Sequence, residues 1–162
     1  MSQKKPIFIV DAMLGNLAKK LRVLGYDSTY FSSIEDEKLV TIAKNEKRII
    51  LTKDELLCKT AQNQDIVSVL IRGNDEFEQI AQIHQIMKFE KFVIDTNNSR
   101  GIICNGKLQP IEKYRAIGKI PEGILEREEK FWMCDGCKKI YWQGTHFEKL
   151  QEFADKLNNR LQ

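Results

Sequence analysis

The first hundred residues alternate between short apolar runs and longer stretches in which apolar residues recur at helical spacing. Residues 7–10, 49–52 and 66–71 are runs rich in Ile, Val and Leu that are too short for helices, and such runs are typical of strands buried on both faces. Residues 28–31 also have strand composition, and residues 92–94 could add one more strand. The pattern therefore predicts four or five strands.

Between these runs, apolar residues repeat every three or four positions, which predicts amphipathic helices. The first helix is expected over residues 14–24, ending at Gly25, a residue suited to the left-handed conformation of a C-cap. Ser32 or Ser33 is expected to cap the second helix, and Asp75 to open the helix after the fourth strand. Strands that alternate with helices form βαβ units, which predict a three-layer α/β fold with a parallel sheet.

Acidic residues follow the predicted strands or open the helices after them. Asp11 follows the first strand and Asp54 the third, while Asp36 and Asp75 open helices after the second and fourth. In a parallel sheet all four lie at the carboxyl edge, where open α/β sheets place their ligands. Like charges gathered there are costly unless a cation offsets them, and hard oxygen ligands suit Mg²⁺ or Mn²⁺. Metals held by carboxylates can support phosphodiester hydrolysis.

Two other interpretations of these acids are available. Helix N-termini attract acids through the macrodipole, which accounts well for Asp36 and Asp75 but less well for Asp11 and Asp54 at the strand exits. A phosphoacceptor receiver domain also has acids after its first and third strands. It needs a close acidic pair after the first strand, however, and this chain lacks one. The metal site is therefore the preferred hypothesis.

Composition sets the remaining bounds. A hydrophobic content of 42% over 162 residues suits one ordinary domain, or one domain with a small appendage. No apolar run approaches the roughly 20 residues of a membrane span, and the polar start lacks the apolar core of a secretion signal. Four unevenly spaced cysteines suit a reducing cytosol, so we expect a cytoplasmic protein. Residues 1–99 are neutral and residues 100–162 carry a net charge of +3, which favours a polyanionic partner.

The segment from Asp11 to Asp27, with segments 36–43 and 49–54, resembles the acidic motifs of PIN-type ribonucleases. The closer likeness is to the PIN-like family named for the C-terminal ribonuclease domain of the Mut-seven exonuclease, and it covers nearly the whole chain. The resemblance implies a PIN-like nuclease domain over residues 1–98. It implies a small zinc-ribbon-like segment with a C-terminal helix over residues 99–162.

The same resemblance implies metal-dependent cleavage of RNA. Asp11, Asp36 and Asp54 would be the catalytic ligands of Mg²⁺ or Mn²⁺, and Glu37 and Asp75 are candidates for completing the set. The usual second acid of PIN nucleases, a Glu on a helix before the second acidic motif, has no clear counterpart in this chain.

The cysteines resemble two metal-binding knuckles, one of which is incomplete. Each knuckle of the family normally carries Cys-x-x-Cys, but Gly101 stands at the first such position here. Three thiols remain for zinc, at Cys104, Cys134 and Cys137, while Cys58 is expected to be a buried structural thiol. His146 could supply a fourth ligand, although a weak or lost zinc site is the preferred expectation.

Basic and aromatic residues interleave around residues 127–147, as in surfaces that bind phosphates and stack on unpaired bases. Small ribbons also use aromatic rings to fill their own core, so about half of the rings are expected to be buried. The residues expected to bind RNA, here and beside the acidic edge, are Lys53, Arg72, Lys138, Lys139, Trp142 and His146.

The sequence leaves several alternatives open. The chain could be a metal-dependent ribonuclease, or a non-catalytic RNA-binding module that keeps the acidic cleft as a relic. The apolar stripe of the last helix, expected over residues 146–161, serves either for docking onto the body or for a dimer contact. A monomer and a homodimer both remain possible, and the RNA target and the endo- or exonucleolytic mode are undetermined.

Overall fold

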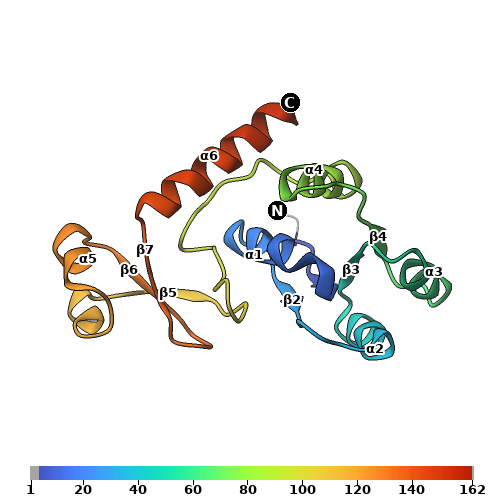
Figure 1. Cartoon of the computed structure of the whole chain (residues 1–162), viewed down its shortest axis with the longest axis horizontal. Helices are drawn as coiled ribbons and strands as arrows, with labels where there is room; N and C mark the ends of the chain where they lie inside the picture. Colours follow the sequence, from blue (N-terminus) through green and yellow to red (C-terminus); the bar gives the residue numbers. More distant parts are fainter. Residues whose placement is uncertain (1–3, 162) are drawn as a thin grey trace. The chain divides into compact units, whose positions relative to one another are not determined.

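The computed structural model describes residues 4–161 and divides into two compact units (Figure 1). The first unit contains the described residues up to Arg22 together with Tyr26–Glu90, and the second contains Val23–Gly25 and the chain from Lys91 onward. These are structural units, so the predicted functional division between residues 98 and 99 stays a prediction.

The first unit is built on a parallel sheet in the order β2-β1-β3-β4. Its strands are β1 (Phe8–Val10), β2 (Ser28–Tyr30), β3 (Ile49–Thr52) and β4 (Ser68–Leu70). Val10 lies opposite both Tyr30 and Leu51, so the carboxyl ends of β1, β2 and β3 meet at one edge. The predicted parallel sheet is confirmed.

Helices cover both faces of this sheet. They are η1 (Ala12–Leu14), α1 (Gly15–Val23), α2 (Asp36–Glu46), α3 (Glu55–Asn63) and α4 (Glu76–Met87). The core between one face and α2 and α3 comprises Ile9, Leu39, Val40, Ala43, Ile50, Leu57, Ala61 and Ile66. On the opposite face, the ring of Phe8 contacts Tyr26, which follows α1, and Phe89, which follows α4. The three-layer α/β prediction is therefore confirmed.

Two local predictions were wrong. Residues 92–94 form no strand, because the Asn158 side chain satisfies both backbone groups of Phe92. Its Oδ1 accepts from the Phe92 N–H at 2.7 Å and its Nδ2 donates to the Phe92 carbonyl at 2.6 Å, so this buried backbone needs no neighbouring strand. The second helix is preceded by Glu35 rather than capped by Ser32 or Ser33, which lie in a bend.

The second unit has an antiparallel sheet in the order β5-β6-β7. Its elements are β5 (Leu108–Ile111), η2 (Lys113–Ala116), α5 (Glu122–Arg127), β6 (Phe131–Cys134), β7 (Ile140–Trp142) and α6 (Thr145–Arg160). One face of the sheet buries Phe131, Met133 and Ile140, and the other buries Trp132 and Cys134. The last helix is confirmed, with Leu150, Ala154 and Leu157 on its buried side. Within residues 4–161, no helix combines the length and apolar character needed to cross a membrane.

Candidate functional site

Asp11 lies at the carboxyl edge of the parallel sheet, directly after β1. Its backbone N–H donates to the Leu51 carbonyl, which continues the pairing with β3 for one more residue. Its Oδ1 accepts from the Ala12 N–H at 2.8 Å, and its Oδ2 accepts from the Thr52 hydroxyl at 2.7 Å. Only 9% of Asp11 is exposed. The carboxylate is therefore held in a fixed orientation by its own turn and by the neighbouring strand.

Thr52 connects two of the predicted site residues. Its side chain is fully buried, and its Oγ1, besides donating to Asp11, accepts from the Asp54 N–H at 3.0 Å. A buried hydroxyl needs such partners, since an unsatisfied one costs free energy. Thr52 is not among the site residues predicted from the sequence. The available signal was a hydroxyl residue ending an otherwise aliphatic strand, two positions before an aspartate.

Asp54 and Asp75 cap helices. Asp54 Oδ1 accepts from the N–H groups of Leu56 and Leu57 at the start of α3, and Asp75 Oδ1 accepts from Glu78 at the start of α4. Capping is therefore more important than expected at Asp54, and also at Asp11, which caps η1. Asp54 nevertheless caps through one oxygen, and its Oδ2 makes no hydrogen bond to another described residue. The Oδ2 of Asp54 is therefore available to bind a ligand.

Asp36, the first residue of α2, is exposed and makes no side-chain hydrogen bond within the described part of the chain. Its pKa is raised above the ordinary value, first by partial burial and then by the negative charges of Asp11 and Asp54. The three carboxylates therefore share one electrostatic field. They are not as tightly grouped as the thiols of the second unit, which form the only described set of three ligand atoms mutually within 4.8 Å.

The other predicted residues of the first unit lie around this acidic edge. Lys53 and Asp75 line one polar hollow at the starts of α1 and α4, and Glu37 lines another with Asp36 between α2 and α3. Arg72 is exposed after β4 and lines neither hollow. The structure thus brings Lys53 near Asp75 and Glu37 near Asp36.

The turn after Asp11 depends on a glycine. Tyr30 at the end of β2 donates its hydroxyl to the Ala12 carbonyl at 2.9 Å. A Cβ at residue 15 would lie 2.8 Å from that hydroxyl oxygen, so the Tyr30 side chain would have to shift. Gly15 therefore allows Tyr30 to hold the turn that carries Asp11.

The three predicted zinc ligands do come together. The Sγ atoms of Cys104, Cys134 and Cys137 lie within 4.8 Å of one another, with 3.3 Å between Cys104 and Cys134. Burial acts to raise the pKa of Cys104, but hydrogen bonds, led by the one with Cys134, lower it overall, which favours the thiolate that binds metal. This donor set fits a zinc ion with three protein ligands. Cys58 is a buried thiol that contacts the Ser68 hydroxyl at 3.1 Å, as expected for a structural role.

Gly101 stands beside these thiols, where the family resemblance implies a cysteine. A Cβ at this position would lie 2.9 Å from Cys134 Sγ and 3.6 Å from the Tyr141 hydroxyl. That hydroxyl is buried without a hydrogen-bond partner of good geometry among the described residues, and burial raises the pKa of Tyr141 to about 12. His146 is exposed and does not belong to the cysteine group. Tyr141, rather than His146, therefore borders the missing corner.

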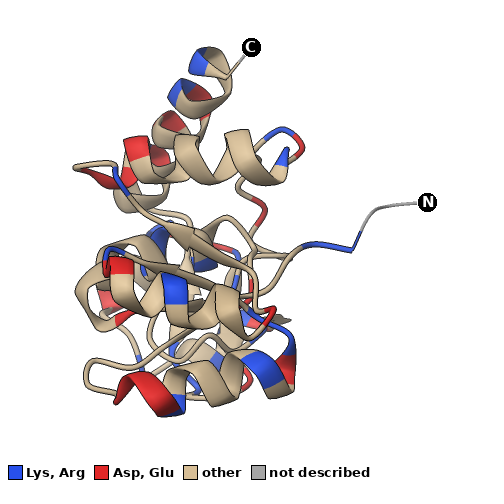
Figure 2. Ribbon diagram, turned by 90° about the vertical axis from the view of Figure 1, so that its right-hand side faces the viewer, with Lys and Arg blue, Asp and Glu red and all other residues tan. Residues whose placement is uncertain are grey.

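The predicted RNA-binding residues of the second unit lie on the β6–β7 turn and around the start of α6. Lys138 donates to the Asp135 carbonyl at 3.0 Å, whereas the Lys139 Nζ lies 5.4 Å from the centre of the Tyr141 ring. Trp142 is partly buried and His146 is exposed. Figure 2 shows basic and acidic residues interspersed along the helices, so local groupings, rather than the net charge, decide where an anion can bind.

We expect Asp36→Asn to raise the melting temperature slightly in metal-free buffer at pH 7. A raised pKa means that the folded state holds this proton more tightly than the unfolded state, so ionised Asp36 costs stability at neutral pH. The cost appears as the pH rises through the interval between the ordinary and the raised pKa, and the gain should vanish below it. Thermal melts at several pH values measure this. Equal melting temperatures of variant and parent at pH 7 would contradict it.

We expect the purified protein to carry less than one zinc ion per chain, and Gly101→Cys to raise both zinc content and melting temperature. A complete site contributes on the order of 10 kcal/mol to folding. The Cys134 sulfur must shift to admit the new Cβ, so Gly101→Ala is the matched control and should destabilise without gaining zinc. Metal analysis with melting curves decides the matter. One tightly held zinc per parent chain would show that a fourth ligand exists already.

Comparisons with known proteins bear on the identity of this chain. The family model described as the Mut7-C RNAse domain matches residues 6–154, which span both units. No curated protein and no solved structure matches the chain. The match agrees with the parallel sheet of the first unit and with the three grouped cysteines of the second. The chain belongs to the Mut7-C RNAse domain family.

Proposed function

We propose that this protein is a divalent-metal-dependent ribonuclease whose site is formed by Asp11, Asp36 and Asp54. The family match supports a nuclease-type hydrolase that acts on RNA. The observation that carries the proposal is the linkage of these carboxylates. The Thr52 hydroxyl ties Asp11 to the backbone of Asp54, and the carboxyl of Asp36 senses the charges of both.

The donor set fits Mg²⁺ or Mn²⁺, because it consists of carboxylate oxygens whose mutual repulsion a cation would relieve. Such an ion, when bound, would polarise a phosphate and lower the pKa of water. The residues of the chain supply orientation. Thr52 and the Ala12 N–H fix the Asp11 carboxylate, and the α3 cap fixes Asp54 while leaving its Oδ2 available. Glu37 and Asp75 are proposed as additional acids from their places in the flanking hollows.

Cations on each unit are candidates for binding the phosphates of RNA. Lys53 lines the hollow that also contains Asp75, and we propose that Lys53, with Arg72, binds phosphates beside the cleft. Lys138, Lys139, Trp142 and His146 would hold the strand on the second unit. The exposed free thiols at Cys104 and Cys137 suit a reducing compartment, which supports the proposal of a cytoplasmic protein.

One observation favours a second candidate, a non-catalytic RNA-binding module. Asp11 and Asp54 already accept backbone N–H groups, and helix capping by itself gives a structural reason for their presence. A binding module needs no metal at this edge. The two candidates differ in whether the parent protein cleaves RNA, and in whether that cleavage requires the carboxylate charges.

We expect Asp11→Asn to abolish cleavage of single-stranded RNA in Mg²⁺ or Mn²⁺ while RNA binding is kept or strengthened. The substitution preserves size and removes charge, which weakens the metal site and lowers repulsion toward phosphate. Cleavage of a labelled oligonucleotide, with and without chelator, measures the first effect, and binding in chelator measures the second. Parent-like cleavage by Asp11→Asn would refute the catalytic assignment.

A graded variant tests the linkage itself. Thr52→Val keeps the shape of the buried side chain but removes the hydroxyl, and a hydrogen bond to a charged group is worth about 1.5–3 kcal/mol. If that hydrogen bond serves to orient the carboxylates for catalysis, the cleavage rate should fall about ten- to a hundredfold. Thr29→Val, at a partly buried threonine of β2 that lines neither hollow, is the matched control and should cleave like the parent. If the parent cleaves no nucleic acid at all, the binding module is favoured instead.

We expect the RNA affinity of the parent to fall with salt, and Lys138→Ala with Lys139→Ala to flatten that dependence. Each lost phosphate contact should reduce the slope of log affinity against log salt by about 0.7 for a single strand. Binding titrations in chelator at several salt concentrations measure the slope. An unchanged slope would place the phosphate contacts elsewhere, and Lys53→Ala with Arg72→Ala is then the comparison to make.

A further inference from the structure

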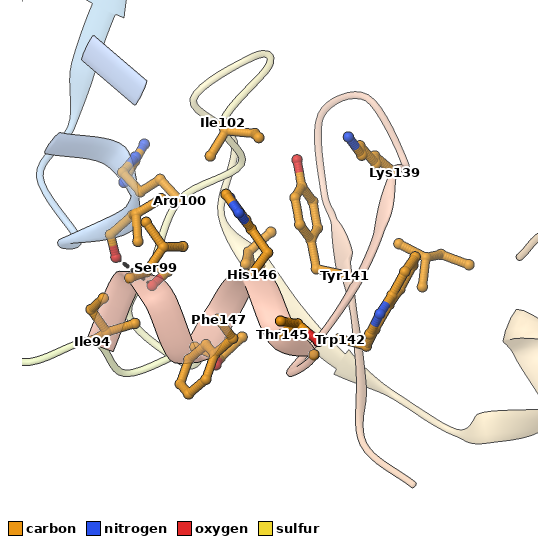
Figure 3. A pocket seen from close by; sticks show the side chains of 16 residues that line it. Ile94, Ser99, Arg100, Ile102, Lys139, Tyr141, Trp142, Thr145, His146 and Phe147 are labelled. Carbon is orange, nitrogen blue, oxygen red and sulfur yellow. Dashed lines mark hydrogen bonds between the residues drawn. The ribbon is translucent and has the colours of Figure 1, made fainter. Parts of the chain in front are cut away.

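A pocket of about 270 Å³ lies within the second unit (Figure 3). It shares one wall residue, Tyr141, with the corner at Gly101, but none of Cys104, Cys134 and Cys137 lines it. Its walls come mainly from residues 94–102, from β7 and from the first turns of α6. They are mainly apolar or aromatic. The wall residues that matter for the argument are Ile102, Tyr141, Trp142, Thr145, His146 and Phe147.

The charged residues of this pocket have one sign. Arg100 and Lys139 line it, His146 adds an imidazole, and no Asp or Glu is among its described lining residues. Asn105 fixes Arg100, because its carbonyl oxygen accepts from the Arg100 Nε at 2.8 Å. The ammonium of Lys139 lies over the Tyr141 ring. The pocket is thus apolar inside, and the cationic side chains of Arg100 and Lys139 have defined positions at its rim.

This combination suits a flat aromatic ligand attached to a negative charge. Protein sites for single-stranded RNA place unpaired bases against aromatic side chains and bind the adjoining phosphates with Lys and Arg. The Tyr141 and Trp142 rings and the aliphatic side chain of Ile102 offer surface for a base. An apolar peptide side chain would fit the hollow but gains nothing from the cations.

We propose that this pocket holds one unpaired base of an RNA strand, with the adjoining phosphate at Lys139 and Arg100. The choice of RNA as ligand rests on the proposed function. The pocket extends that function by giving the second unit a defined subsite for one nucleotide, in addition to a general attraction for phosphates. Its walls belong entirely to the second unit, so the proposal requires nothing of the first.

The test fills the pocket and compares two adjacent isoleucines. Ile102 lines the pocket, whereas Ile103 is 61% exposed and does not. We expect Ile102→Trp to bind a labelled oligouridine about tenfold more weakly than the parent in chelator, the scale of one lost stacking contact, and Ile103→Trp to bind like the parent. Equal binding by Ile102→Trp and the parent would overturn the proposal.

A second variant tests the same pocket in case Ile102→Trp, which lies close to the cysteines in the sequence, fails to fold. Thr145 lines the pocket from the first turn of α6 and is exposed, so Thr145→Phe can occupy the space from a position that is remote in sequence from the cysteines. Melting curves and zinc analysis show whether each variant is folded. If Ile102→Trp is unfolded, Thr145→Phe carries the test, and parent-like binding by folded Thr145→Phe overturns the proposal.

Photocrosslinking of the unaltered protein locates the base directly. An oligonucleotide with one 4-thiouridine should attach to Tyr141, Trp142 or His146, as mapped by mass spectrometry. Attachment confined to the first unit would overturn the proposal, and so would efficient competition by an apolar peptide but not by uridine monophosphate.

The outcome is separable from that of the proposed function. All these binding measurements are made in chelator, where no metal-dependent cleavage occurs. If the parent protein cleaves RNA and Ile102→Trp binds RNA normally, the proposed base pocket is wrong and the proposed ribonuclease function stands. If the parent protein does not cleave RNA and Ile102→Trp loses affinity for RNA, the proposed ribonuclease function is wrong and the base pocket stands.

Discussion

The hydrogen bond between the Thr52 hydroxyl and the Asp11 carboxylate follows from how β1 pairs with β3. Parallel pairing sets Val10 opposite Leu51, so the residue after β1 meets the last residue of β3. One of these residues is a fully buried hydroxyl and the other is a nearly buried carboxylate, and each would be costly without a partner. Because the same hydroxyl also accepts from the Asp54 N–H, one side chain sets the positions of two acids.

Capping and metal binding are compatible uses of these acids. The positive end of a helix dipole favours the ionised carboxylate, which is the form that a divalent cation needs. Asp54 gives only Oδ1 to its cap, so the cap orients the carboxylate without occupying both oxygens. Asp36 lacks such a bond, and its pKa is raised first by partial burial and then by the negative charges of the other two. Cap hydrogen bonds therefore stabilise the charges of Asp11 and Asp54 but not that of Asp36. A bound cation would stabilise the Asp36 charge most.

The sequence predicted what depends on local periodicity and topology. The third strand was predicted at its observed bounds of Ile49–Thr52, and the convergence of Asp11 and Asp54 followed from parallel connections alone. The role of Thr52 required the register between strands 41 positions apart, which composition does not give. The irregular segment at residue 92 likewise depends on Asn158, 66 positions later, whose amide replaces a strand partner. Long-range side-chain contacts were thus the part that patterns along the chain missed.

Close packing around the sulfur of Cys134 helps to set the path of the chain in the incomplete knuckle. A Cβ at Gly106 would lie 2.5 Å from Cys134 Sγ, and one at Gly101 would lie 2.9 Å from it, so the chain passes close to this thiol from two sides. Cys134 itself is buried in β6, where Trp132 and Leu108 form an apolar cluster with it. The path of the knuckle is thereby set by backbone contact and apolar burial as well as by ligands. We therefore expect loss of one thiolate to weaken metal binding more than it alters the path of the chain.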